Sequence, residues 1–327
     1  MRVVVTGGGG FLGGRIVRQL LAQGHDVTSV SRSSYPELEA LGVRCIPCDL
    51  VDEASTLEAL RGAELVFHVA AKAGVWGKLS DYEAANVQAT QNVVSACQKH
   101  GIPKLVHTSS PSVCFDGTDH VMASNDVAPA TQFLAHYPAT KARAEELVLA
   151  ANSETLATCA LRPHLVFGPG DPHILPRLID RARRGRLFIV GEGTNEVTVS
   201  YVENAAHAHL CAAKSLAPDA PHAGCAYFVG QEQPVLLWDW INGLLQRLGI
   251  ARVERQLSLR SAYRIGAVME AAWRMLPLRG EPPMTRFVAT QLARSHSYDM
   301  GPARRDFGYS ELVSMEAALD ATVAAFR

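Results

Sequence analysis

The sequence lacks the features that would mark it as a membrane, secreted or nucleic-acid-binding protein. It has no uninterrupted apolar run approaching the roughly eighteen residues of a membrane-spanning helix. Its formal net charge is -1, so no bulk electrostatic field favours nucleic acid or an anionic membrane. Its N-terminus has neither the long apolar segment nor the small-residue cleavage site of a signal peptide. We therefore expect a cytoplasmic globular protein with no transmembrane segment and no nucleic-acid partner.

Cysteine pairs with the spacing of a zinc site or a disulfide framework are also missing. Of the seven cysteines, only Cys45 and Cys48 are closely spaced. This pair could be a redox dithiol, but no second pair supplies further zinc ligands. It does not lie at a helix N-terminus, where the pKa of a thiol would be lowered. We interpret both cysteines as small apolar residues at the end of a buried strand and expect no metal site.

Patterns of hydrolases and of histidine-rich metal sites are absent too. The sequence has no Gly-x-Ser-x-Gly motif, so it does not predict a hydrolase nucleophile. His207 and His209 stand two residues apart, but no acidic cluster accompanies them. We interpret these histidines as packing or capping residues rather than as metal ligands or members of a triad.

Short apolar runs alternate with helical patterns through the first half of the chain. The runs Val3–Val5 and Leu65–Phe67 are continuously apolar, as expected for strands buried on both faces. Strands separated by helices predict parallel pairing through right-handed crossovers. The predicted fold class is therefore α/β, a doubly wound parallel sheet of the Rossmann type. The expected strands are 2–6, 26–31, 43–46, 64–68, 104–108 and 157–162, and the expected helices lie near 11–23, 35–41, 53–61, 83–100 and 137–151.

The second half of the chain has a different texture. Prolines and glycines cluster in 162–172, and helical pieces joined by irregular segments follow. We expect residues 1–163 to form a cofactor-binding domain and 164–327 to form mainly a smaller, C-terminal substrate-binding lobe. An apolar stretch at 226–229 predicts a further strand, and part of the chain near 195–230 is expected to return to the first domain.

Two segments of this lobe have alternative interpretations. The segment 263–276 is apolar or small apart from Arg264, Glu270 and Arg274, which fall within one sector of a helix. It is a lid over a lipidic substrate, a membrane-surface contact or, as we favour, a lobe helix buried on a wide face. An arginine-rich run favours a solvated helix face over a site for an anionic substrate tail, and its members are Arg177, Arg181, Arg183, Arg184 and Arg186.

A glycine loop follows the first predicted strand. Gly7, Gly10 and Gly13 stand between that strand and an apolar-periodic helix. Glycine at these positions permits a tight turn, lets the backbone approach a pyrophosphate and brings the helix close to the strand. The helix N-terminus adds free N–H groups and a partial positive charge. The loop therefore predicts dinucleotide binding, with Phe11 and Leu12 also contacting the cofactor.

The end of the second predicted strand bears on the choice between NAD and NADP. An NAD site usually places an acidic residue there, against the ribose hydroxyls. This chain has Arg32 flanked by serines, and no acid. Since a guanidinium offers a planar fork of donors to a 2′-phosphate, the sequence favours NADP(H) over NAD(H).

Residues at other strand ends complete the expected cofactor site. Asp49 and Leu50 follow the third strand, where the adenine would lie. Ala70 and Ala71 follow the fourth strand, and small side chains there would let the cofactor lie against the backbone. The remaining expected cofactor contacts are Tyr137, Lys141, Pro163 and Val166.

A serine, a tyrosine and a lysine form the candidate catalytic set. Ser110 follows the fifth predicted strand, at the edge where parallel sheets bind ligands. Tyr137 and Lys141 are one helical turn apart, and Pro138 suits the first turn of that helix. An ammonium near a phenol favours phenolate and would lower the tyrosine pKa from about 10 towards working pH. The set predicts a phenol that exchanges a proton while a nicotinamide exchanges a hydride.

With these residues in place, the chain resembles the extended short-chain dehydrogenase/reductases over essentially its full length. The loop 6–13 matches the cofactor loop of that family, and 86–90 resembles its helix motif. Ser110, Tyr137 and Lys141 match its catalytic set. The resemblance implies an NAD(P)-dependent alcohol dehydrogenase or ketoreductase that forms a homodimer through the helices near 86–100 and 137–151. It also implies a structural role for Asn86.

Within that family, the chain is most similar to the 3β-hydroxysteroid dehydrogenase-like branch, and in that branch to the 2-alkyl-3-oxoalkanoate reductases of bacterial olefin synthesis. The first similarity rests on 161–163, 167–171 and 303–309, and the second on 70–77, 111–113 and 261–268. One departure is 113–116, which reads Val-Cys-Phe-Asp where relatives often carry an aromatic-glycine pair. This loop faces the substrate in such folds, so at this motif the resemblance does not indicate which substrate the chain uses.

The resemblance and the residues together imply a function in lipid metabolism. We expect NADPH-dependent reduction of the 3-keto group of a hydrophobic 2-alkyl-3-oxoalkanoic acid, with the reverse oxidation on the same residues. The alternative is a 3β-hydroxysteroid or sterol-4-carboxylate 3-dehydrogenase. Nucleotide-sugar epimerisation is less favoured, because an apolar lobe suits a sugar diphosphate poorly. A regulator that binds NADP(H) without catalysis is disfavoured, because it would not need the intact catalytic set.

Overall fold

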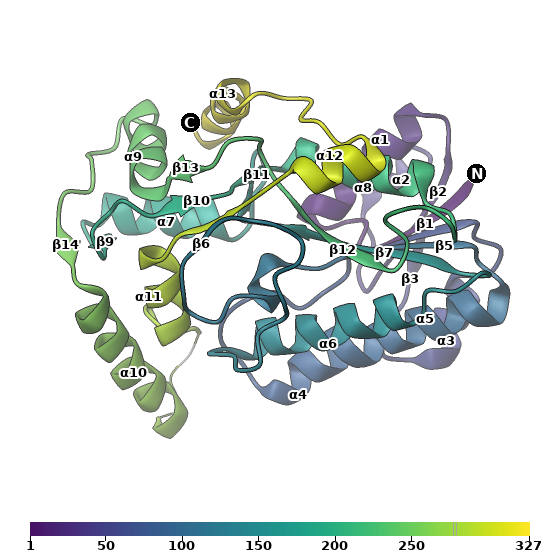
Figure 1. Ribbon diagram of the computed structural model, residues 1–327, viewed down its shortest axis with the longest axis horizontal. Coiled ribbons are helices and arrows are strands. Elements are labelled where there is room, and N and C mark those ends of the chain that lie inside the picture. The colour runs from purple at the N-terminus through teal and green to yellow at the C-terminus, as the bar shows by residue number, and fades with distance from the viewer. Residues whose placement is uncertain (277, 279) are drawn as a thin grey trace.

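A seven-stranded sheet forms the centre of the computed structural model, which describes residues 1–276, 278 and 280–327 (Figure 1). The strand order is β12-β7-β5-β4-β1-β2-β3, and all neighbouring strands are parallel. The carboxyl ends of these strands therefore meet at one edge of the sheet. The strands are β1 (Arg2–Thr6), β2 (Asp26–Ser31), β3 (Arg44–Pro47), β4 (Leu65–His68), β5 (Lys104–Thr108), β7 (Ala157–Pro163) and β12 (Cys225–Val229).

Helices cover both faces of this sheet, as a doubly wound fold requires (Figure 1). Helices α3, α5 and α6 lie on one face, and α1 packs with α8 on the other. All six strands predicted for the first half are confirmed to within one residue at each end, and the strand predicted at 226–229 is confirmed as β12. The helices so far are α1 (Phe11–Ala22), α2 (Pro36–Glu39), α3 (Glu53–Ala59), α5 (Ala89–His100), α6 (His136–Ala150) and α8 (Val202–Ser215).

The helix predicted at 83–100 is not a single α-helix. It begins as α4 (Leu79–Tyr82), widens into a π-helical turn, η1 (Glu83–Gln88), and continues as α5. Within η1, Asn86 is buried and its Oδ1 accepts from the Lys72 backbone N–H at 2.7 Å. Its Nδ2 donates to Thr140 Oγ1 of α6 at 3.0 Å. Asn86 thus ties the segment after β4 to α6, which agrees with its expected structural role.

A second unit contains a four-stranded sheet of order β13-β10-β15-β6. Strand β6 comes from the first half of the chain, between β5 and α6, which the sequence did not predict. The core of this unit packs around Trp238, Phe167 and Leu244. Its strands and helices are β6 (His120–Ala123), β8 (Val166–Phe167), β9 (Ile189–Val190), β10 (Glu196–Val197), β11 (Ser200–Tyr201), β13 (Val235–Leu236), β14 (Gln256–Leu257), β15 (His296–Tyr298), α7 (Ile174–Arg183), α9 (Leu237–Arg247), α10 (Leu259–Met275), α11 (Arg286–Ala293) and α13 (Met315–Phe326). Helix α12 (Gly301–Phe307) instead packs against β12 and α8 of the first unit.

Helix α10 contradicts the interpretation of 263–276 as a helix buried on a wide face. Val268 is 69% exposed and Met275 is 77% exposed. The buried side is narrow, and Gly266 on that side lies against the start of α11. A Cβ added at Gly266 would be 2.6 Å from the carbonyl carbon of Thr285. Glu270, expected among the solvated residues, is buried and accepts from Arg286 Nε at 2.8 Å. Within the described residues, no helix is long and apolar enough to cross a membrane.

The arginine-rich run lies on and just after α7. Most of its members are exposed, in agreement with a solvated face. Two of them nevertheless contact the segment before α11. Arg177 Nη1 lies 2.6 Å from Glu281 Oε2, and Arg181 Nη2 donates to the Pro283 carbonyl at 2.6 Å. The run therefore helps to fix the connection between α10 and α11.

Candidate active site

The glycine loop follows β1 and crosses the carboxyl edge of the sheet. Gly7 has φ +68°, a left-handed conformation that favours glycine. A Cβ at Gly7 would lie 2.9 Å from the Cα of Ala70, which follows β4. A Cβ at Gly13 would lie 2.2 Å from the Gly7 carbonyl oxygen. These two contacts leave no room for a side chain, so the start of α1 lies directly against the loop.

The N-terminus of α1 fits the pyrophosphate of a dinucleotide. Among the described residues, no side chain caps this end and no acid lies in its first turn. The loop residue Gly10 and the helix residue Phe11 line a cavity of about 480 Å³. Arg15 and Arg18, one and two turns into α1, line the same cavity, as does Glu37. Backbone donors at a helix N-terminus with nearby cations suit a bound phosphate.

Two arginines of α1 and one aromatic residue beside the glycine loop were not among the residues predicted from the sequence. A Cβ at Gly9 would lie 2.1 Å from the ring of Tyr35, so this ring covers the outer side of the glycine loop. Tyr35 follows the strand-end arginine Arg32 by three residues, and Arg32 itself is exposed. Only spacing could have revealed Arg15 and Arg18, because they stand four and seven residues after Phe11 on the same helix. Tyr35 carries no such signal.

The other expected cofactor residues lie at the same edge of the sheet. Asp49 is exposed beyond β3, while Leu50 is buried against α3. The Ala70 N–H donates to Thr6 Oγ1 at 3.3 Å, and Ala71 is exposed. Pro163 ends β7 and Val166 begins β8, with Leu165 between them at φ +41°. A leucine in the left-handed region is strained, and such strain is common at functional sites.

Ser110 lies just after β5, where the chain turns into the short 3₁₀ helix η2 (Pro111–Val113). Its Oγ caps that turn by accepting from the Ser112 N–H at 3.3 Å, and it lies 2.9 Å from Ser112 Oγ. Ser110 is half-buried, whereas Ser112 is buried. Ser112 therefore fixes the position of the Ser110 hydroxyl just beyond the carboxyl end of β5.

Tyr137 lies in the first turn of α6 and is half-buried. Pro138 is the third residue of α6, within the first turn, where its missing N–H would have no partner inside the helix. Burial raises the pKa of the Tyr137 phenol, and a side-chain interaction with Ser110 lowers it. The raised pKa differs from the expected shift towards phenolate. Its physical cause is desolvation, while Lys141 interacts with groups of β5 instead.

Lys141 is 2% exposed, one turn further along α6. Its Nζ donates to the Thr108 carbonyl at 2.6 Å and lies 3.1 Å from His107 Nε2. Burial lowers the pKa of Lys141 to about 7, and the Glu145 carboxylate raises it in part. The structure thus places Ser110, Tyr137 and Lys141 around the carboxyl end of β5, with a lysine that titrates near neutral pH.

A buried ion pair joins α6 to β7 directly behind this site. Arg162 Nε donates to Glu145 Oε2 at 2.9 Å, and Arg162 Nη2 donates to Glu145 Oε1 at 2.5 Å. Both side chains are 4% exposed. The guanidinium also lies over the Phe228 ring of β12, 5.1 Å from its centroid. The pair fixes the catalytic helix on the sheet.

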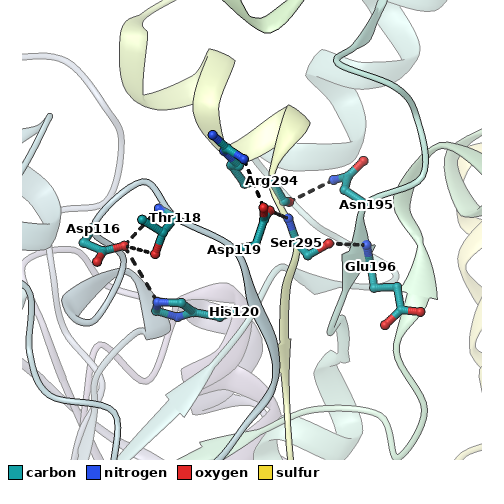
Figure 2. A network of polar contacts seen from close by, with 8 residues as sticks. All are labelled: Asp116, Thr118, Asp119, His120, Asn195, Glu196, Arg294 and Ser295. Carbon is teal, nitrogen blue, oxygen red and sulfur yellow. Dashed lines mark hydrogen bonds and ion pairs between the residues drawn. The ribbon is translucent and has the colours of Figure 1, made fainter.

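The loop after Ser110 is bound to the second unit. Phe115 is buried and meets the Phe287 ring of α11 edge to face, with centroids 6.3 Å apart. Figure 2 shows the next part of this loop, where Asp119 accepts from Arg294 Nη1 at 3.0 Å and from the Ser295 N–H at 2.7 Å. The departure from the family pattern at 113–116 is therefore part of a wall that both units share.

The cysteine and histidine pairs noted in the sequence belong to the core. Burial raises the pKa of both Cys45 and Cys48, which opposes a reactive thiolate. His209 is fully buried, with Nδ1 2.7 Å from the Ala205 carbonyl and Nε2 2.8 Å from Thr108 Oγ1. His207 lies 3.2 Å from the sulfur of Cys211. These contacts agree with the packing interpretation.

Comparisons with known proteins agree with this geometry. Residues 4–259 match the model of the 3-beta hydroxysteroid dehydrogenase/isomerase family. The 2-alkyl-3-oxoalkanoate reductase of Stenotrophomonas maltophilia is 50% identical over 321 residues, which cover 98% of this chain and 97% of the relative. The decarboxylating sterol-4-alpha-carboxylate 3-dehydrogenase of Homo sapiens is 32% identical over 332 residues, covering 100% of this chain and 88% of the relative.

Solved structures extend the agreement to the fold. MoeE5 in complex with UDP-glucose and NAD is 26% identical, with a TM-score of 0.77, and the match covers 100% of this chain and 99% of MoeE5. The likeness spans the parallel sheet, the glycine loop and the second unit together. Sequence, fold and family model therefore lead to one assignment: this chain belongs to the 3-beta hydroxysteroid dehydrogenase/isomerase family.

Proposed function

We propose that this protein reduces the 3-keto group of a hydrophobic 2-alkyl-3-oxoalkanoic acid with NADPH, and oxidises the 3-hydroxy acid in reverse. The observation that carries this proposal is the grouping of Ser110, Tyr137 and Lys141 at the end of β5, on the same edge of the sheet as the glycine loop. The relative at 50% identity, named for that substrate class, supports the choice of substrate.

The three side chains would have distinct roles. NADPH, when bound, supplies the hydride to the carbonyl carbon. Because burial raises the pKa of Tyr137, its phenol keeps its proton at neutral pH and can donate that proton to the carbonyl oxygen. Ser110 would hydrogen-bond the same oxygen and stabilise the charge that develops there. Lys141 would hold the nicotinamide ribose.

The test is turnover on a panel in which only the substrate class changes. Purified protein is mixed with NADPH and 2-alkyl-3-oxo acids, with the ketones left after loss of their carboxyl group as matched controls. The reverse reaction is followed with 3-hydroxy acids, 3β-hydroxysteroids and sterol carboxylates. We expect turnover of the oxo and hydroxy acids and little of the ketones. Robust steroid oxidation without any reaction of the acids would refute the proposed substrate.

A preference for NADP(H) is part of the proposal, and Arg32 supports it because this exposed guanidinium follows β2 directly. The variant Arg32→Asp should lower kcat/KM for NADPH by about 10- to 100-fold, because it removes a hydrogen bond to a charged group. The same variant should raise kcat/KM for NADH. Arg44→Ala, at the opposite, amino end of the neighbouring strand, should change neither value. An unchanged ratio of NADPH to NADH efficiency in Arg32→Asp would show that another residue selects the cofactor.

A sterol-carboxylate dehydrogenase is the second candidate, and the human relative at 32% identity favours it. The exposed apolar face of α10 is compatible with either hydrophobic substrate. A regulator that binds NADP(H) without turnover would need none of the three catalytic side chains. The homodimer through the helices near 86–100 and 137–151, and the cytoplasmic location, stay predictions.

A further inference from the structure

Lys141 is hydrogen-bonded by a histidine that has no role in the proposed reaction. His107 belongs to β5 and is fully buried, and its Nε2 lies 3.1 Å from Lys141 Nζ. The second partner of Nζ is the Thr108 carbonyl, at 2.6 Å. An ammonium that is 2% exposed has lost its water and depends on such acceptors. Within the described residues, His107 is therefore the side chain that hydrogen-bonds Lys141 Nζ.

The hydrogen bonds of two neighbouring histidines, His68 and His209, define their protonation states. Thr90 Oγ1 donates to the Asn86 carbonyl, so it accepts from His68 Nε2 at 2.9 Å, and His68 Nδ1 accepts from Thr6 Oγ1 at 2.8 Å. Burial lowers the pKa of His68 to about 3. By the same reasoning His209 carries its proton on Nδ1, facing Ala205. Both imidazoles are thus neutral with one defined tautomer.

His107 differs because its own protonation depends on Lys141. Burial and the nearby lysine hold the pKa of His107 well below its usual value, so the ring is neutral. An ammonium can only donate, so Nε2 accepts when Lys141 is charged. The proton of His107 is then on Nδ1, which is buried without a hydrogen-bond partner among the described residues. When Lys141 loses its charge, the ring can instead donate from Nε2 to the amine.

We propose that His107 is a positioning residue that holds Lys141 Nζ at the carboxyl end of β5 and, as a hydrogen-bond acceptor, favours its charged form. This inference rests on the proposed function, because it assigns a role in the same catalytic set. The titratable groups that act on the pair are His68 of β4, His209 of α8 and Glu145 of α6. Of these, only Glu145 adds a charge that favours the ammonium.

The first experiment needs no turnover. In ¹⁵N-histidine NMR of the protein without added cofactor, the signal of His107 is assigned by its loss in His107→Gln. We expect its Nε2 and Nδ1 shifts to follow one transition near pH 7 that reports the charge of Lys141. The transition should disappear in Lys141→Met. The chemical shifts of His68 and His209 should be the same in Lys141→Met as in the wild type. A His107 signal that is indifferent to pH and to Lys141→Met would overturn the proposal.

The second experiment follows the pH dependence of NADP⁺ binding and of kcat/KM for NADPH. Removing an acceptor from a buried ammonium lowers its pKa, so the charged form is lost at lower pH. In His107→Phe, binding and kcat/KM should therefore begin to fall about one pH unit earlier as pH rises. His107→Gln, which keeps an acceptor at a similar distance, should restore the wild-type profile.

The outcomes separate this inference from the proposed function. A merely structural role of His107 would lower binding equally at every pH and would not be rescued by glutamine. If the pH limb of NADP⁺ binding moves as expected but no oxo acid is reduced, the positioning role holds and the proposed substrate fails. If His107→Phe does not fold, the NMR experiment with Lys141→Met still decides the question.

Discussion

Tyr137→Phe is expected to lower kcat by about 10²- to 10⁴-fold, the contribution of a positioned general acid, while NADPH binds as before. The phenylalanine ring keeps the packing of the first turn of α6 and removes only the proton that the carbonyl oxygen would receive. The loss should be equal in kcat and kcat/KM, because the phenol acts in the transition state. Single-turnover kinetics with 2-alkyl-3-oxo acids and fluorescence titration with NADPH measure the two quantities separately.

The matched control is Tyr227→Phe on the edge strand β12. The Tyr227 hydroxyl donates to Asp306 Oδ2 of α12 at 2.7 Å, and its strand lies two strands away from β5 in the sheet. This variant should keep wild-type kcat even if it loses some stability. Should Tyr137→Phe retain more than about a tenth of the wild-type kcat, Tyr137 cannot be the proton donor and the mechanism proposed above is wrong.

Breaking the buried ion pair behind the site is expected to cost about 3–5 kcal/mol in the free energy of unfolding. In Glu145→Gln the guanidinium of Arg162 loses its countercharge inside the protein, where water cannot replace it. Its Nη1 already has no hydrogen-bond partner among the described residues. The variant should also lower the pKa of Lys141 further, because the Glu145 carboxylate is the group that raises it.

Urea denaturation at neutral pH measures this loss. Asp180→Asn is the control, since it breaks an exposed pair with Arg184 and should change the free energy of unfolding by less than about 0.5 kcal/mol. The double variant Glu145→Leu with Arg162→Met should recover much of the loss, because two apolar side chains leave no buried charge. A stable Glu145→Gln protein would mean that water reaches the guanidinium.

The central sheet could be predicted from the sequence because its signals are local. Each strand of the first half is a short apolar run between a helix and a turn, and each ends within one residue of its predicted bound. Strand β6 could not be predicted, since His120–Ala123 pairs with residues near 296, far along the chain. The exposure of α10 was missed for a similar reason. Its narrow buried face depends on Gly266 meeting Thr285, a contact that helical periodicity does not contain.

The catalytic set could be predicted because its spacing and its resemblance to a family both stand in the sequence. Its electrostatics could not. The expected lowering of the Tyr137 pKa assumed that Lys141 acts on the phenol, whereas the folded chain brings Lys141 to His107 and Thr108. In the sequence, His107 is one residue of a predicted strand, and nothing there links it to Lys141. Only the folded structure, in which Lys141 of α6 reaches β5, shows that His107 is its partner.

The π-helical turn at Glu83–Gln88 is an α-helix with one residue too many. Deleting one residue there would restore regular α-helical winding and change the direction of the side chains inside the turn. Asn86 would then no longer meet both Lys72 and Thr140. The position of this asparagine therefore depends on the length of the chain as well as on its residues. In an alignment of relatives, a single-residue gap in this helix should accompany loss of the asparagine.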